Sequence, residues 1–271
     1  MTDNELNAVV IQKVEVAPGL IVLRVKPDGW DLPEFIPGQF ATLGLPGKAA
    51  RCQLSDAEDK PADPDKIIKR AYSIASSSRL KEYIEFFITL VRSGQLTPRL
   101  FSLEVGSRLL MGQKFRGVFT IDLAPEDKNI VMIATGTGLA PYMSVIRTCL
   151  NMTGNRRFAI LHGARHSWDL GYRSELITLS GLSDNFEYIP SISRPDEEHV
   201  PWGGHTGYVQ DLWKNGLVEK AWGLKPLPDN THVFLCGSPD MVETTVSILK
   251  AEGYKEHKKK DPGQVYVERW W

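Results

Sequence analysis

The first half of the chain alternates short apolar runs with turns. The runs are rich in β-branched and aromatic residues, and Pro-Gly pairs at 18–19 and 37–38 interrupt them. They are residues 9–16, 20–25, 40–45, 71–76 and 83–91. Short strands separated by such turns are typical of an antiparallel barrel. Segment 48–69 breaks this pattern, because it is polar, mixed in charge and contains two prolines. We expect a long surface excursion there, either a solvated loop or a segment that binds a partner.

The second half alternates apolar strands with amphipathic helices. Strands are expected at 129–134, 157–162, 186–193, 231–236 and 264–268. Helices are expected near 174–182 and after Pro141 and Pro239. This alternation predicts a parallel sheet covered by helices on both faces. The pattern changes at 123–128, so we predict a two-domain fold in which an antiparallel β-barrel domain at 1–124 precedes an α/β domain at 125–271.

Composition and charge narrow the function classes. A length of 271 residues suggests two domains, and a net charge of −1 gives no support to nucleic-acid binding. No apolar run reaches the ~18 residues of a membrane span, and the acidic start is unlike a secretory signal. The three cysteines lie far apart and the 6 histidines show no ligand spacing. We therefore expect a cytoplasmic protein without a metal, a disulfide framework or an iron–sulfur cluster of its own.

A glycine-rich loop connects the first strand of the second half to its helix. The loop reads Gly136-Thr137-Gly138-Leu139-Ala140-Pro141. Glycines let the backbone approach a pyrophosphate, and the N–H groups at a helix start point at the anion. Proline stands at the third glycine position of the dinucleotide fingerprint, so the loop departs from it. The alternative is a tight strand–helix turn without a ligand.

Polar residues follow the other strands at the edge where open α/β sheets bind ligands. Arg165 follows the second strand and Ser193-Arg194 ends the third. Two arginines at neighbouring strand ends suggest a site for the 2′-phosphate of an adenosine. The Tyr208 ring could stack on the adenine of the same nucleotide. Either arginine alone could be an ordinary surface charge. Cys236 ends the fourth strand, where it either faces the site or fills the core as a small apolar side chain.

Two features of the first half suggest a second anion site. In Arg70-Ala71-Tyr72-Ser73, strand alternation points Arg70 and Tyr72 the same way, so one can hold a phosphate while the other lies on a ring system. In Gly94-Gln95-Leu96-Thr97-Pro98, we expect Thr97 to cap a helix that Pro98 begins. A structural capped turn is the alternative. Trp270 and Trp271 either plug the core or cover a planar cofactor.

Taken in order along the chain, these motifs resemble one family. They are the Arg70–Ser73 motif, Gly94 through Leu100, Ala134 through Gly138, His162-Gly163-Ala164-Arg165, Ser193-Arg194, Leu235-Cys236-Gly237 and the aromatic end. The order is similar to that of ferredoxin–NADP⁺ reductases, especially the bacterial ferredoxin/flavodoxin reductases. The resemblance spans essentially the whole chain, and the ordered set is far more specific than any single motif.

The resemblance implies an FAD-binding barrel followed by an NADP-binding α/β domain. Arg70 and Thr97 would hold the pyrophosphate of non-covalent FAD, Tyr72 would stack on the isoalloxazine, and Ser73 would lie near its N5. The other FAD contacts implied are Ala71, Phe87, Ile88, Leu96 and Thr137. Trp270 would cover the other flavin face, and Trp271 would lie against the adenine.

The resemblance also assigns the NADP(H) contacts. The ribose and pyrophosphate would lie over Thr135, Gly136, Thr137 and Gly138. Ser193, Arg194, Arg165 and Tyr208 would bind the 2′-phosphate and adenine, and Cys236 and Glu268 would line the hydride-transfer pocket beside Ser73. Bacterial members often have arginine at Tyr208, and plant-type members have lysine at Thr206. One phosphate-binding cation is therefore missing on either pattern.

The activity implied is hydride transfer between nicotinamide C4 and flavin N5, followed by electron transfer to ferredoxin or flavodoxin. We expect a monomer or a weak dimer that binds its acidic carrier through a basic patch that includes Lys258, Lys259 and Lys260. An alternative on the same fold is the NAD(P)H-dependent reductase component of an oxygenase, or a free-flavin reductase. A nucleotide-binding regulatory module without turnover is an alternative of another class.

Overall fold

The computed structural model describes residues 6–150 and 155–269. The chain divides into two compact units: Met1–Thr120 with Met143–Thr148, and Ile121–Tyr142 with Cys149–Trp271. The predicted domain boundary between 124 and 125 remains a prediction.

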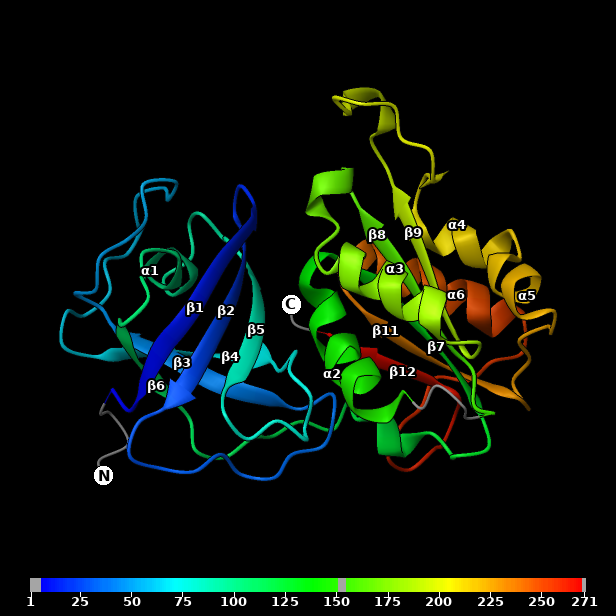
Figure 1. Ribbon diagram of the computed structural model, residues 1–271, viewed down its shortest axis with the longest axis horizontal. Helices are drawn as coiled ribbons and strands as arrows, with labels where there is room; N and C mark the ends of the chain where they lie inside the picture. The colour runs from blue at the N-terminus through cyan, green and yellow to red at the C-terminus, as the bar shows by residue number, and fades with distance from the viewer. Residues whose placement is uncertain (1–5, 151–154, 270–271) are drawn as a thin grey trace. The chain divides into compact units, whose positions relative to one another are not determined.

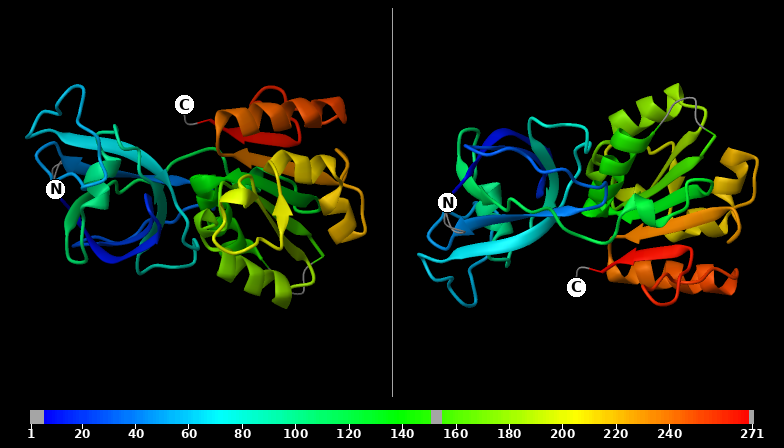
Figure 2. Two further views of the ribbon diagram at one scale, coloured as in Figure 1. Left: turned by 90° about the horizontal axis from the view of Figure 1, so that it is seen from above. Right: turned by 90° about the horizontal axis from the view of Figure 1, so that it is seen from below.

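The first unit is an antiparallel barrel (Figures 1 and 2). Its strands are β1 (Ala8–Ala17), β2 (Leu20–Pro27), β3 (Phe40–Pro46), β4 (Ile67–Ser73), β5 (Ile84–Thr89) and β6 (Arg108–Met111). They are ordered β4-β3-β6-β1-β2-β5, and a bridge between Ile74 and Phe86 joins the two ends. Alternate side chains of the strands point inward and form the apolar core of the barrel. Helix α1 (Thr97–Phe101) follows β5.

The second unit is an open sheet whose six strands are all parallel. Its strands are β7 (Asn129–Thr135), β8 (Phe158–Ala164), β9 (Phe186–Ile192), β10 (His205–Thr206), β11 (Thr231–Cys236) and β12 (Val265–Glu268). Their order is β10-β9-β8-β7-β11-β12. All six residues of β11 are buried, as expected of a parallel strand covered on both faces.

Helices cover both faces of this sheet (Figure 2). On one face α4 (Val209–Lys214), α5 (Leu217–Trp222) and α6 (Pro239–Ala251) pack against strand side chains in a continuous apolar core. Helix α3 (Arg173–Leu182) lies on the other face. Helix α2 (Ala140–Cys149) follows β7 after a 3₁₀ turn over Gly136–Leu139. The fold class predicted from the sequence, a barrel and a helix-covered parallel sheet, is confirmed.

Several predicted element boundaries are wrong. Strand β4 begins at Ile67, because Ile67 to Lys69 pair with β3 and therefore belong to the barrel rather than to the excursion. The sequence pattern did not predict β6, α4 or α5. Strand β6 has four residues and each helix has six, which is too short for a hydrophobic pattern to reveal them. None of the helices in residues 6–150 and 155–269 is both long and apolar enough to cross a membrane.

Candidate functional site

The strand order of the second unit reverses at β7, because β8 lies on one side of it and β11 on the other. Ligands of open α/β sheets bind beyond the carboxyl ends of the strands at such a reversal. There the loop after β7 meets the loop after β11, and the Ser238 N–H donates to Thr135 Oγ1 at 2.8 Å. Thr135 therefore joins the two loops at this edge of the sheet.

Glycines allow these loops to pack against each other. A Cβ atom on Gly138 would lie 2.2 Å from the Cys236 carbonyl oxygen. Gly237 has a φ of +152°, and a Cβ there would lie 2.2 Å from Thr135 Oγ1. Gly136 differs, because at its φ of +54° an added Cβ would meet no atom within 4 Å. The open side of the Gly136 backbone gives a ligand close access to the start of α2.

Cys236 and Glu268 end two neighbouring parallel strands and lie side by side. The Cys236 thiol is 2% exposed, and its Sγ donates to Glu268 Oε2 at 3.7 Å. Burial, and then the Glu268 charge, raise the pKa of the Cys236 thiol well above its usual value. Cys236 is therefore a neutral thiol at physiological pH, not a thiolate nucleophile. Tyr142, also buried, donates to the Ile133 carbonyl at 3.2 Å, and burial raises its pKa too.

The second strand of this unit, β8, carries a buried imidazole near its carboxyl end. Burial lowers the pKa of His162 to about 4, so the ring is neutral. Its Nδ1 lies 3.1 Å from the Tyr188 hydroxyl. Gly163 follows, where a Cβ would lie 2.8 Å from Val209 Cβ and would push helix α4 away. His162 and Gly163 thus serve packing, and they bring the start of α4 close to the strand end.

Three of the predicted coenzyme residues gather at the ends of β8 and β9. The Ser193 N–H donates to the Ala164 carbonyl at 3.0 Å, and the Arg194 N–H donates to the Arg165 carbonyl at 3.0 Å. Both arginines are exposed. Tyr208, 66% exposed, directly follows Gly207, whose N–H donates to the Ile192 carbonyl at 2.9 Å. Exposed guanidinium groups and an exposed phenol ring that follow neighbouring strands suit a phosphorylated nucleoside.

Sequence reasoning missed a charged cluster beside these arginines. His166 Nε2 lies 2.8 Å from Glu197 Oε2, and its Nδ1 lies 3.1 Å from Asp169 Oδ2. Glu197 also contacts Arg194, with its Oε1 3.3 Å from Nη1. The partners lie 31 residues apart on separate loops, so no spacing in the sequence could have indicated them.

In the first unit, strand β4 carries the predicted flavin residues. Arg70 is exposed, and its Nη1 donates to the Lys69 carbonyl at 2.8 Å. The Tyr72 ring meets Phe86 edge to face with centroids 6.5 Å apart, and burial raises its pKa. Ser73 and Ala71 are half-buried on the same strand. An exposed guanidinium two residues from an aromatic ring is a donor set that suits a pyrophosphate joined to a flat ring system.

Three further predicted FAD contacts, at Phe87, Ile88 and Leu96, are buried, and they differ in which of their atoms could contact a ligand. Ile88 is 1% exposed and belongs to the barrel core, so its main chain would have to make any flavin contact. Phe87 is 4% exposed and alternates with Ile88, so its side chain points away from the core. Leu96, at 2% exposure, packs inside the core.

The expectation that Thr97 caps helix α1 is wrong. Leu96 is the N-cap residue, and no side chain caps the helix. Thr97 Oγ1 instead accepts from the Val91 N–H at 3.0 Å and donates to the Val91 carbonyl at 3.1 Å. The hydroxyl closes the turn between β5 and α1, because the chain doubles back there.

The polar excursion lies at the surface, and a few of its residues fasten it to this turn. We call residues 47–66 the strap. Glu58 Oε1 accepts from Arg51 at 2.7 Å and from Arg99 at 2.6 Å, and Arg99 is 3% exposed. Arg51 also donates to the Gly94 carbonyl at 2.9 Å, and the Cys52 N–H donates to the Pro98 carbonyl at 2.9 Å. The strap thereby fixes the backbone of the turn.

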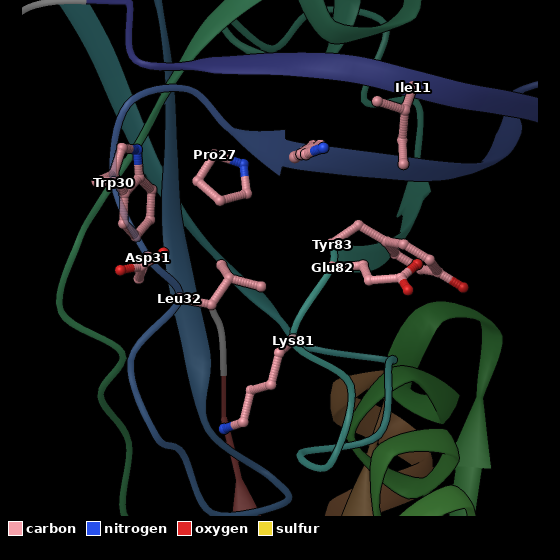
Figure 3. Close-up of a pocket in the computed structure, with 9 residues that line it drawn as sticks. Ile11, Pro27, Trp30, Asp31, Leu32, Lys81, Glu82 and Tyr83 are labelled. Carbon is pink, nitrogen blue, oxygen red and sulfur yellow. The ribbon is translucent and has the colours of Figure 1, made fainter.

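The barrel also carries a hollow of about 590 Å³ (Figure 3). Its walls combine two lysines, two acids and apolar side chains. They are Ile11, Lys26, Pro27, Trp30, Asp31, Leu32, Lys81, Glu82 and Tyr83. None of them is a predicted site residue. Elsewhere, the described ranges contain no group of three His, Cys, Asp or Glu side chains that could hold a metal.

Comparison with known proteins identifies the family. Residues 132–247 match the model of the oxidoreductase NAD-binding domain. The flavodoxin/ferredoxin–NADP reductase of Buchnera aphidicola (subsp. Baizongia pistaciae) is 31% identical over 238 residues, 88% of each chain. The chain belongs to the flavodoxin/ferredoxin–NADP reductase family. The ferredoxin–NADP reductase of Azotobacter vinelandii is 30% identical over 243 residues, 86% of this chain and 85% of its own.

A solved structure of the family shares the fold over nearly its full length. A ferredoxin NADP⁺ reductase from Neisseria gonorrhoeae, crystallised with bound FAD and NADP, is 25% identical with a TM-score of 0.79 and covers 98% of both chains. The residues at hand fit both groups: Arg70 offers unused donors, and the open side of Gly136 and the exposed Arg165 and Arg194 suit a dinucleotide phosphate. Trp270 and Trp271 lie outside the described residues.

Proposed function

We propose that this chain is an FAD-dependent oxidoreductase that moves electrons between NADP(H) and ferredoxin or flavodoxin. The observation that carries the proposal is the arrangement of loops and strand ends where the strand order reverses. There Gly136 leaves open backbone, Thr135 and Ser238 join two loops at 2.8 Å, and the Cys236–Glu268 pair lies at the adjoining strand ends. Relatives at about 30% identity over most of this chain carry the same activity in their names.

We propose the following residues as those that would hold each group. For FAD they are Arg70, Ala71, Tyr72 and Ser73 on β4, Phe87 and Ile88 on β5, Leu96 and Thr97 at α1, Thr137, and the tail residues Trp270 and Trp271. For NADP(H) they are Thr135, Gly136, Thr137, Gly138, Arg165, Ser193, Arg194, Tyr208 and Cys236. Thr97 would act through the turn that it closes, because its hydroxyl already bonds Val91.

When bound, FAD supplies hydride exchange with the nicotinamide and the division of an electron pair into single steps. The chain supplies binding and orientation. Arg70, Arg165 and Arg194 neutralise phosphate charge. The Cys236 thiol, kept neutral by burial, donates to the Glu268 carboxylate, so this pair forms a fixed surface at the strand ends, and the thiol keeps its proton near neutral pH. Ser73, Cys236 and Glu268 are the residues proposed to position the reacting rings, and the reaction needs no general base from the chain.

The carrier, the compartment and the oligomeric state are part of the same proposal. The relatives are named for flavodoxin and ferredoxin, and we propose one or both as the carrier. Three free cysteines suit a reducing cytoplasm. A monomer or weak dimer is consistent with two units that each have an apolar core of their own.

Anaerobic titration of the purified protein tests the proposal. NADPH should bleach the flavin absorbance, and the reduced protein should then reduce ferredoxin or flavodoxin faster than free FMN. Fast reduction of free FMN with none of either carrier would identify a flavin reductase instead. A protein that binds NADPH but holds no reducible flavin would be a nucleotide-binding module, and the proposal would be wrong.

A further inference from the structure

A carboxylate lies between two cationic side chains at the ends of β8 and β9. Glu197 places Oε2 2.8 Å from His166 Nε2. The same carboxylate meets Arg194 Nη1 at 3.3 and 3.4 Å. An anion held between an imidazole and a guanidinium marks the kind of position that a phosphate group would occupy.

The imidazole is held in one orientation by a second set of contacts. Asp169 Oδ2 lies 3.1 Å from its Nδ1. The Trp168 ring stacks on the imidazole with centroids 4.4 Å apart and planes at 10°, and His199 stacks on the far side of Trp168 at 5.2 Å. Only 14% of the His166 side chain is exposed. The Nε2 atom therefore faces the Glu197 carboxylate as a fixed donor.

The same strand ends carry the proposed coenzyme arginines. The Arg194 N–H donates to the carbonyl of Arg165, the residue just before His166. The chain has threonine at 206 and tyrosine at 208, so neither position provides a further cation for the 2′-phosphate. We propose that His166 is an additional cation of the 2′-phosphate subsite, and that Glu197 is a built-in competitor that the phosphate displaces. This inference rests on the proposed function and adds two specificity-determining residues to it.

Charge accounts for both roles. NADPH differs from NADH by one phosphate, which is close to dianionic above its second pKa of about 6. A phosphate that displaced Glu197 would gain two donors, His166 Nε2 and Arg194 Nη1. One anion can contact both donors at once, because the Glu197 carboxylate already does so. Glu197, which remains nearby, opposes the phosphate by repulsion. The pair thus sets how far the protein favours NADPH over NADH.

The pH dependence follows from the groups that face His166. On the loop of His166 itself they are Asp169 and Arg165, the residue that precedes His166. From the loop after β9 they are Arg194, Glu197 and Glu198, the last of which accepts from Ser167. Glu197 first, and Asp169 after it, raise the pKa of His166. The imidazolium is thus present below the raised pKa and lost above it. The preference for NADPH should therefore fall as pH rises through the raised pKa of His166.

Three single variants test the inference, each loaded with FAD. In His166→Gln, NADPH and adenosine 2′,5′-bisphosphate should bind about tenfold more weakly, with NADH and adenosine 5′-phosphate unchanged. The pH dependence of the NADPH preference should also disappear. In Glu197→Gln, NADPH should bind about twofold to fivefold more tightly. His205→Gln is the matched control, because His205 is an exposed histidine on β10 and is not part of the ring stack, and it should change neither coenzyme.

Calorimetry with the two adenosine phosphates separates this inference from the proposed function, since it needs no turnover. Equal loss of both nucleotides in His166→Gln, or no loss, would overturn the role of His166. Weaker NADPH binding in Glu197→Gln would overturn the role of Glu197. A wild-type protein that prefers NADH would overturn both. Wild-type protein that binds the 2′-phosphate selectively, while NADPH does not reduce its flavin, would refute the proposed function and leave the subsite in place.

Discussion

Replacing Gly136 with alanine adds one methyl group to the open side of the loop after β7. Gly136 has a φ of +54°, and the new Cβ would meet no protein atom within 4 Å. The cost to folding is therefore that of placing a non-glycine residue in the left-handed region, about 1–2 kcal/mol. The methyl group would stand where the proposed pyrophosphate approaches the backbone.

Coenzyme binding should suffer more than folding. A hydrogen bond to a charged group contributes about 1.5–3 kcal/mol, so loss of one phosphate contact should weaken NADPH about tenfold to a hundredfold. NADH should weaken by the same factor, because it carries the same pyrophosphate. Flavin difference spectra give both affinities, and thermal unfolding gives the stability. NADPH and NADH affinities equal to wild type would refute the assignment of this loop.

Two other glycines serve as controls. Gly181 lies within α3, where an added Cβ also meets nothing within 4 Å, so Gly181→Ala should stabilise the protein by about 0.5–1 kcal/mol and leave both coenzymes unchanged. In Gly138→Ala the Cβ would lie 2.2 Å from the Cys236 carbonyl oxygen. That variant should lose stability by about 1–3 kcal/mol or more as the two loops separate.

Three further changes test other parts of the molecule. Glu58→Gln removes the charge that joins Arg51 of the strap to Arg99 of the turn. FAD should then bind about tenfold more weakly, while binding of FMN, which lacks the pyrophosphate, should not change. Equal loss of both flavins would indicate general destabilisation. Neutralising the exposed Lys258, Lys259 and Lys260 should slow carrier reduction and flatten its salt dependence, and unchanged stopped-flow rates would place the docking patch elsewhere. Trp270→Ser should tighten NADPH and NADH and reduce selectivity, as expected of a displaceable lid, whereas lost thermal stability without tighter binding would identify a structural tryptophan.

The sequence predicts the second unit better than the first, for a physical reason. Strands buried on both faces are continuous apolar runs, so β7 and β11 stand out from their surroundings. Strand β4 follows a polar excursion and carries exposed Lys69 and Arg70, so its first residues resemble loop. Strand β6 has four residues and pairs with β1 and β3, which are far away in sequence. Such short elements are stabilised by their neighbours rather than by their own pattern.

The candidate site residues also differ in how far the sequence could place them. The sequence could place Arg165, directly after β8, and Cys236, at the end of β11, at one edge of the sheet, because the carboxyl ends of parallel strands share that edge. His166 and Glu197 meet only because two loops after different strands come together. Glu58 lies 41 residues from Arg99 in the sequence. The mixed charge of segment 48–69 does not indicate which of its acidic residues would pair with Arg99. Contacts between loops depend on tertiary packing, which periodicity does not encode.

The protonation state of Cys236 decides what kind of contribution it can make. Burial and the neighbouring Glu268 carboxylate both raise its pKa, so the thiol stays neutral across the range in which a free cysteine, with a pKa of about 8.5, would ionise. Hydride transfer should then show no step between about pH 7 and about pH 9 that disappears in Cys236→Ala.

The contribution of the thiol would be its position, which matters most when the rings are aligned. Cys236→Ala should therefore lower the rate of flavin reduction by NADPH more than it lowers NADPH affinity, and Cys236→Ser, which retains a small donor toward Glu268, should recover part of the rate. Stopped-flow reduction resolves both quantities. A wild-type rate in the alanine variant, or a pH step that the alanine variant abolishes, would contradict a neutral positioning thiol.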